Sequence, residues 1–124
     1  MTGWDRKKLV YIASPYAGDL ENNIAFAKAA CRYAVKQGCA PVAAHLLYPQ
    51  LLDDSIPEER ELGIRMGLRV LEACDELWIC GERLSQGMQA EYRKAKALGM
   101  PVQYFSEREI LMEGGCPVME MRQC

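Results

Sequence analysis

The chain has 124 residues, a formal net charge of −2 and a pI near 5.5, and half of its residues are hydrophobic. This length fits one domain with a core of its own and excludes two. The acidic balance argues against a nucleic-acid partner, which requires a basic face. No segment approaches the roughly 18 apolar residues of a membrane span, so we expect no membrane partner either.

The six cysteines, at positions 31, 39, 74, 80, 116 and 124, include no CxxC pair, and His45 is the single histidine. Zinc sites need closely spaced thiolates or imidazoles, so we expect no metal site. Disulfide frameworks are typical of smaller, loop-rich secreted domains. The N-terminal residues contain no apolar signal-peptide core. We therefore expect reduced thiols in a cytoplasmic protein.

The first predicted element is a buried strand over residues 9–13 (LVYIA), an apolar run rich in β-branched and aromatic residues that ends at Ser14 and Pro15. Asp19 is placed to cap a helix whose apolar residues recur at helical spacing. Gly38 is placed to end that helix. A second, weaker strand is predicted over residues 40–44, followed by a polar loop.

The next helix is predicted to begin at Ser55, which has capping-box spacing to Glu58. This helix carries two apolar stripes, the first made of Leu62, Met66, Val70 and Ala73 and the second of Ile64, Leu68 and Leu71. Because one sheet cannot bury both, the second stripe predicts contact with another helix or another subunit, and we expect a homo-oligomer, a dimer or higher. Packing against the C-terminal segment is the alternative.

A third strand is predicted over residues 76–80, a third helix from Ser85 to Leu98 with Gly99 as its stop, and a fourth strand over residues 101–105. Alternating strands and helices indicate parallel βαβ units. We expect an α/β, three-layer Rossmann-like or flavodoxin-like domain over residues 9–112, with four to five parallel strands in the order 2-1-3-4. Residues 1–8 would be an N-terminal extension and residues 113–124 a flexible tail.

Such sheets bind ligands beyond the carboxyl ends of their strands, where the strand order reverses. The loops at that edge are residues 14–18, 45–54 and 81–87. In the first loop, Ser14, Pro15, Tyr16 and Gly18 offer a backbone-rich surface, and Tyr16 could stack on a ring. His45 follows the second strand closely enough to reach the same crevice, although a lone histidine is more often structural.

Glu91 is the candidate catalytic carboxylate. It falls on the predicted inward stripe of the third helix, which contains Met88, Glu91, Ala95 and Leu98. Burying a carboxylate without a partner is unfavourable and raises its pKa, so a carboxylate retained beside a crevice is a candidate nucleophile or acid/base group. An ion pair with Lys94, Arg65 or Arg69 is the alternative interpretation.

Ser85 and Gly87 lie at the start of the same helix, where a hydroxyl, free N–H groups and close backbone approach favour a phosphate or carboxylate. Ser85 as an ordinary helix cap is the alternative. Met88 follows them and is counted with this binding site. No Walker A or GxGxxG motif is present, so neither an ATPase nor a dinucleotide enzyme is indicated, and we expect no cofactor.

Four segments resemble the nucleoside 2-deoxyribosyltransferase superfamily, which includes the deoxynucleoside monophosphate N-glycosidases: residues 10–18 (VYIASPYAG), residues 74–79 (CDELWI), Ser85-Gln-Gly87 with Glu91, and residues 98–102 (LGMPV). A more extensive resemblance is to uncharacterised bacterial and phage proteins of the DUF4406 or DUF7768 type. It rests on residues 41–49 (PVAAHLLYP), 53–54, 58–63 and 81–88.

The resemblance implies that Glu91 attacks the anomeric carbon of a deoxyribosyl group, as in a retaining glycosidase. Ser85 is similar to the phosphate-binding serine of the monophosphate hydrolases, where the transferases have an acidic residue. Tyr11 matches a tyrosine beside the nucleophile, whereas its position in the strand alone favours a core role. The implied ligand is a small-molecule nucleotide or nucleoside.

Two positions depart from the hydrolase pattern. Ala17 stands where the hydrolases have a phosphate-holding arginine, and Gly67 stands where they have the aspartate that protonates the leaving base. General acid help is typically worth about 10²–10⁴-fold in rate. Substitutes for that acid would have to come from Asp53, Asp54, Glu61 or His45.

These features predict an N-glycosidase or deoxyribosyltransferase that acts on a nucleotide or nucleoside through Glu91. The rival hypothesis is a protein that binds a nucleotide or an ADP-ribose-like ligand without turnover. A third hypothesis is an oligomeric structural protein with a vestigial pocket.

Overall fold

Four short parallel strands form the centre of the structure, a computed structural model that describes residues 7–15 and 18–114. The strands are β1 (Leu9–Ala13), β2 (Ala40–Val42), β3 (Glu76–Cys80) and β4 (Val102–Phe105). They lie in the order β2-β1-β3-β4, and every neighbouring pair is parallel. The predicted α/β fold and strand order are confirmed. The switch point of this order lies between β1 and β3, whose crossover helices leave on opposite faces.

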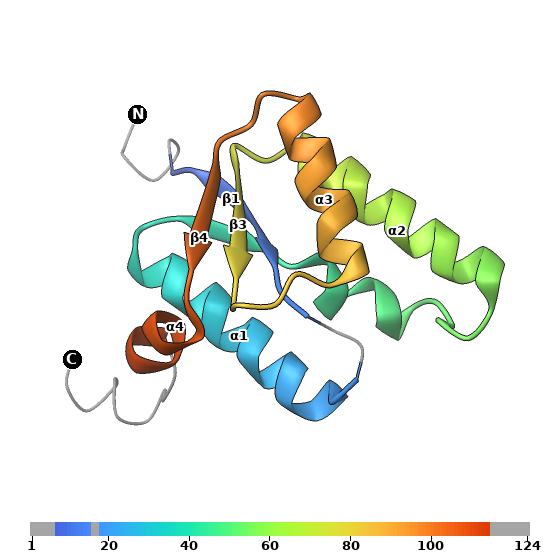
Figure 1. Cartoon of the computed structure of the whole chain (residues 1–124), viewed down its shortest axis with the longest axis horizontal. Coiled ribbons are helices and arrows are strands. Elements are labelled where there is room, and N and C mark those ends of the chain that lie inside the picture. The colour runs from blue at the N-terminus through green and yellow to red at the C-terminus, as the bar shows by residue number, and fades with distance from the viewer. Residues whose placement is uncertain (1–6, 16–17, 115–124) are drawn as a thin grey trace.

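Two helices cover each face of the sheet (Figure 1): α1 (Leu20–Lys36) and α4 (Glu107–Gly114) on one, α2 (Pro57–Glu72) and α3 (Gln86–Ala97) on the other. Strand side chains alternate between these faces. In β1, Val10 and Ile12 pack with α1, whereas Tyr11 and Ala13 pack with α2 and α3. This alternation directs Tyr11 toward the face that carries Glu91.

The predicted helix boundaries of α1 and α3 are confirmed by their caps. The Asp19 carboxylate accepts a hydrogen bond from the Asn22 N–H at 3.3 Å, and the Ser85 hydroxyl accepts one from the Met88 N–H at 3.3 Å. Beyond their C-terminal ends, Gly38 and Gly99 have φ of +84° and +70°, the left-handed conformation that ends helices.

The capping box predicted at Ser55 is wrong. The N-cap of α2 is Ile56, which provides no side-chain cap, and Pro57 is its first residue. Ser55 instead donates from its hydroxyl and its N–H to the Asp53 carboxylate, at 2.6 and 2.9 Å. An aspartate two residues before a serine forms such a turn readily and competes with the cap.

Neither apolar stripe of α2 is wholly buried or wholly exposed. Leu71, in the stripe expected to meet a partner, is fully buried in the core, whereas Ile64 of that stripe is 40% exposed. In the first stripe, Val70 packs against the core, but Leu62 and Met66 are 45% and 40% exposed. The C-terminal helix α4 does not cover them, because it packs against α1 on the other face, with Ile110 buried.

Two boundaries and the position of Leu98 differ from the prediction. Strand β2 stops at Val42 and is followed by two short 3₁₀ turns, η2 (Ala44–Leu46) and η3 (Tyr48–Gln50). Leu98 is 48% exposed rather than inward, because α3 ends at Ala97 and Leu98 is its C-cap. Helix α4 extends to Gly114, two residues into the predicted tail, and the rest of that tail lies outside the described residues. Within the described ranges, no helix has the length and apolar character to cross a bilayer.

Candidate active site

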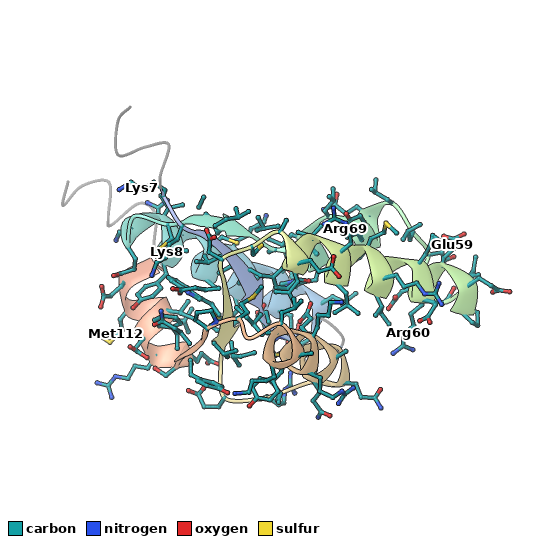
Figure 2. The ribbon with its side chains drawn as sticks, turned by 90° about the horizontal axis from the view of Figure 1, so that it is seen from above. Lys7, Lys8, Glu59, Arg60, Arg69 and Met112 are labelled. Atoms are coloured by element: carbon teal, nitrogen blue, oxygen red, sulfur yellow. The ribbon has the colours of Figure 1, made fainter. Side chains whose placement is uncertain are left out.

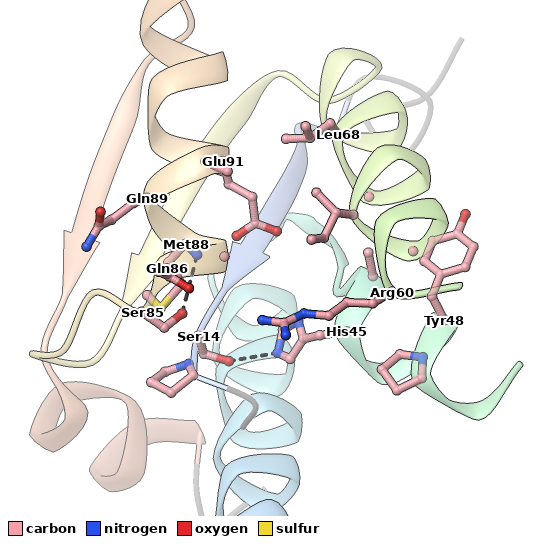
Figure 3. Close-up of a pocket in the computed structure, with 18 of the residues that line it drawn as sticks. Ser14, His45, Tyr48, Arg60, Leu68, Ser85, Gln86, Met88, Gln89 and Glu91 are labelled. Atoms are coloured by element: carbon pink, nitrogen blue, oxygen red, sulfur yellow. Dashed lines mark hydrogen bonds between the residues drawn. The ribbon is translucent and has the colours of Figure 1, made fainter. Parts of the chain in front are cut away.

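A crevice of about 790 Å³ opens beyond the carboxyl end of β1, on the face covered by α2 and α3 (Figure 3). Its walls come from the end of β1, from the turns η2 and η3, from one side of α2, and from the start of α3 with the loop before it. It therefore lies at the switch point of the sheet, the position that the strand order predicts for a ligand.

The crevice collects eight of the ten residues that the sequence singled out: Tyr11, Ser14, Pro15, His45, Ser85, Gly87, Met88 and Glu91. Gly18 is described but does not line it. Tyr16 lies outside the described residues.

Glu91 is held by Tyr11. The Tyr11 hydroxyl donates a hydrogen bond of 2.5 Å to Glu91 Oε2, and among the described residues no other side chain binds this carboxylate. The alternative ion pairs do not form. Lys94 lies 2.8 Å from a Glu72 oxygen and Arg69 lies 3.9 Å from the other, while Arg65 pairs with Glu61 at 3.7 Å.

Burial changes the protonation of this pair. It raises the pKa of Glu91 to about 7, against a smaller lowering by the hydrogen bond from Tyr11. Burial and the neighbouring Glu91 also raise the pKa of Tyr11, so the tyrosine stays protonated and acts as the donor. Glu91 therefore changes charge near neutral pH, as a nucleophile or an acid/base group does.

Glu76 is a structural carboxylate of this protein, and its hydrogen bonds and pKa differ from those of Glu91. It is 5% exposed and accepts hydrogen bonds from Lys8 at 2.7 Å, Trp78 at 3.0 Å and Gln103 at 2.8 Å. Burial works to raise the pKa of Glu76, but these hydrogen bonds together lower it. Glu91 accepts a hydrogen bond from a single side chain and lines a crevice. The need for a stable fold therefore does not explain why a carboxylate stands at this position.

The first turn of α3 forms the second polar feature of the crevice. The Ser85 hydroxyl is engaged by the Met88 N–H, and the N–H groups of Gln86 and Gly87 have no partner among the described residues. A side chain at Gly87 would meet nothing within 4 Å, so the backbone there is open to the cavity. Free N–H groups and the helix dipole favour an anion at this position.

Ser14 and His45 form the third polar feature of the crevice. Ser14 is 4% exposed at the end of β1, and its hydroxyl lies 2.8 Å from His45 Nε2, within hydrogen-bonding distance (Figure 3). Burial lowers the pKa of His45 to about 4, so the imidazole is neutral at physiological pH. The pair therefore offers neutral hydrogen-bonding groups rather than a positive charge. Among the described residues, no group of three or more His, Cys, Asp or Glu side chains is placed to hold a metal ion.

A family model described as a domain of unknown function, DUF7768, matches residues 8–105. The chain belongs to the DUF7768 family. Of the two types that the sequence resembles, DUF7768 is the one shown. Among curated proteins, none matches the sequence.

The fold of this chain is similar to that of a 2-deoxyribosyltransferase from the psychrotolerant bacterium Bacillus psychrosaccharolyticus, described as a biocatalyst for the synthesis of antiviral and antitumoral nucleosides. The TM-score is 0.62 at 19% sequence identity, over 79% of this chain and 72% of the other. This likeness shows that the two proteins share a fold.

The structure gives a physical reason for the glycine at position 67. A Cβ atom there would lie 3.1 Å from the Tyr11 hydroxyl, which is closer than nine in ten Cβ contacts, and 3.7 Å from the Ala44 Cβ. The space next to Gly67 is thus filled by the tyrosine that holds Glu91. Of the suggested substitutes for the missing acid, Asp54 and His45 line the crevice, whereas Asp53 binds Ser55 and Glu61 pairs with Arg65.

Residues of α2 and η3 that line the crevice were not predicted from sequence. They include Tyr48, Arg60 and Leu68. A charged residue in the first turn of a helix is typical of a solvent-exposed face, and nothing in the spacing indicates that this side of α2 faces a cavity.

Proposed function

We propose that this protein cleaves or transfers the N-glycosidic bond of a nucleotide or nucleoside, with Glu91 as the nucleophile. The observation that carries the proposal is a carboxylate with one hydrogen bond, from Tyr11, in a crevice at the switch point of the sheet. A carboxylate of this kind forms covalent glycosyl intermediates in retaining glycosidases.

In the proposed reaction, the free oxygen of Glu91 attacks the anomeric carbon while Tyr11 holds Oε2. The bond from that carbon to the base nitrogen breaks, and its electron pair leaves with the base, which takes up a proton. Water or a second base then attacks the same carbon and releases the Glu91 carboxylate. Asp54 and the Ser14–His45 pair are the crevice groups available to guide the proton to the base.

The remaining predicted site residues are assigned to binding. Ser85, Gly87 and Met88 at the start of α3 would hold the phosphate end of a nucleotide, since two free N–H groups point to anion binding there. Ser14, Pro15 and His45 would contact the sugar from the opposite wall. Tyr16 and Gly18 remain assigned to binding on the basis of the sequence alone.

A panel of nucleosides, their 5′-monophosphates and NAD-type dinucleotides, analysed for free base by chromatography, tests the reaction. We expect base release from at least one nucleoside or nucleotide. Melting shifts with a ligand and no release from any compound would favour the rival function, a nucleotide or ADP-ribose-like binding protein. The glycine at position 67 favours that rival, whereas a pure anion binder gains nothing from a carboxylate in its crevice.

Base release should depend on pH through Glu91. The nucleophile must be ionised, so the rate is expected to rise with pH and to level off above about 7, where burial places the pKa of Glu91. In Tyr11→Phe the hydrogen bond that lowers this pKa is absent, so the midpoint should move to higher pH. Initial rates between pH 5 and 9 for both proteins measure this. An unchanged midpoint in Tyr11→Phe would show that Tyr11 does not affect the pKa of Glu91.

The exposed apolar side chains of α2 support the proposal of a homo-oligomer. Leu62 and Met66 lie on a surface that neither the sheet nor α4 covers within the described chain. A second copy would bury this surface and gain roughly 25 cal/mol per Å² of apolar area. Light scattering on the purified protein should show a dimer or larger, and Leu62→Lys with Met66→Lys should reduce its mass. A wild-type monomer at micromolar concentration would contradict the proposal.

A further inference from the structure

Three cations of α2 and α3 have acidic partners: Arg65 pairs with Glu61, and both Arg69 and Lys94 pair with Glu72. The crevice is lined by three other arginines, Arg60, Arg83 and Arg93. Within the described residues, none of these three has an acidic partner. Among the described residues, Arg60 and Arg93 are therefore the cations of these two helices that line the cavity without a counter-charge, whereas Lys96 lies over the Tyr92 ring and does not line it.

Arg60 reaches into the cavity from α2. It lies in the first turns of α2, and its guanidinium extends across the crevice toward His45 and Ser14 (Figure 3). Figure 2 shows Arg60 and Arg69 projecting from opposite sides of α2, as residues about two and a half turns apart must. The outer side of α2 thus carries the ion pairs, and the inner side presents Arg60 to the ligand.

The acidic neighbours of Arg60 do not neutralise it. Glu59 also lines the crevice, but its carboxylate accepts a 2.7 Å hydrogen bond from the Asp53 N–H in the loop before α2. Asp54 lines the crevice without an ion pair to Arg60 among the described residues. His45, beside the guanidinium in Figure 3, is neutral and does not compete for an anion.

Arg60 and the first turn of α3 line the same crevice from two different helices. A guanidinium donates two parallel hydrogen bonds to the oxygens of a phosphate. The free N–H groups of Gln86 and Gly87 can donate hydrogen bonds to the same phosphate. We propose that Arg60 clamps the 5′-phosphate of the ligand against the start of α3, so that the substrate class is a nucleoside 5′-monophosphate rather than a nucleoside.

The proposal supplies a cation for the phosphate from α2, in place of the first-loop arginine that is absent at Ala17. It deepens the proposed function, because it names the form of the substrate for the same crevice. Its test uses binding alone, so that its failure can be distinguished from failure of the glycosidic chemistry.

Isothermal titration with ribose 5-phosphate and 2-deoxyribose 5-phosphate gives dissociation constants that depend neither on the base nor on turnover. We expect the wild type to bind at least one sugar phosphate and Arg60→Ala to bind it about 10- to 100-fold more weakly, the usual effect of losing a charge-assisted pair. Arg60→Lys should fall between them, since a lysine keeps the charge without the fork. Arg65→Ala, which loses only a surface ion pair of the same helix, is the matched control and should bind as the wild type.

Equal dissociation constants for Arg60→Ala and the wild type would overturn the clamp, as would a wild type that binds neither sugar phosphate. Thermal melting of each variant shows that it is folded. Base release that needs Glu91 but is equally fast for nucleosides and nucleotides would leave the proposed function standing and remove this inference. Sugar-phosphate binding that needs Arg60, with no base release from any compound, would support the phosphate clamp and contradict the proposed function.

Discussion

Glu91→Gln is expected to lower the rate of base release by about 10⁴-fold or more, because it removes the only atom assigned to form a bond with the sugar. The amide has the size of the carboxylate and can still accept a hydrogen bond from Tyr11. Sugar-phosphate binding should therefore persist, and the loss should lie in kcat. Glu72→Gln, which changes a carboxylate on the outer surface of α2, is the matched control and should retain full activity.

The same variant should be more stable than the wild type at alkaline pH. The folded-state pKa of Glu91 is raised from 4.5 to about 7, so unfolding becomes easier as the pH rises through this range and the buried carboxyl ionises. Glutamine has no such penalty, and the melting temperature of Glu91→Gln should exceed that of the wild type at pH 8. A melting temperature equal to the wild type at pH 8 would show that burial of Glu91 is not unfavourable. Base release that survives in Glu91→Gln would contradict the mechanism.

Gly67→Asp is expected to destabilise the protein rather than to restore a general acid. The new Cβ would lie 3.1 Å from the Tyr11 hydroxyl, and the carboxylate beyond it would be buried beside the carboxyl group of Glu91. Overpacking and a second buried carboxylate together should reduce the free energy of unfolding by about 2–4 kcal/mol. The melting temperature should fall by roughly 10 °C or more, and base release should fall because Tyr11 is displaced from Glu91.

Gly63→Ala provides the control for Gly67→Asp. Gly63 lies one turn earlier on α2, and a Cβ there would meet only the Leu52 side chain at 3.5 Å, an ordinary contact. Alanine in place of a helical glycine should therefore leave the melting temperature unchanged or raise it. Faster base release by a stable Gly67→Asp protein would show that Tyr11 and an acid at position 67 can coexist, against the packing argument.

The sheet could be predicted because each strand is a short apolar run with clear stops, such as Gly38 before β2 and Gly81 after β3. Helix α4 was missed because its sequence, EREILMEG, carries few apolar residues and ends at a glycine. Its place depends on the groove along α1 that buries Ile110, which exists only in the folded protein.

The part of the site that depends on helical spacing and on where the strands end could be predicted from the sequence. Helical spacing alone placed Glu91 toward the sheet, and the end of β1 placed Ser14 at the crevice. The contact with Tyr11 follows from alternation along β1 but spans 80 residues, so only the resemblance indicated it beforehand. Arg60 could not be found in this way, because its role depends on how α2 lies across the end of the sheet.

Acid-quenched turnover followed by peptide mass spectrometry tests the central claim most directly. With a nucleotide or nucleoside that releases base, we expect the peptide containing Glu91 to gain the mass of the glycosyl group. We expect no such gain in Glu91→Gln. Release of base with the sugar attached to a different residue, or release that is equally fast in Glu91→Gln, would contradict the account.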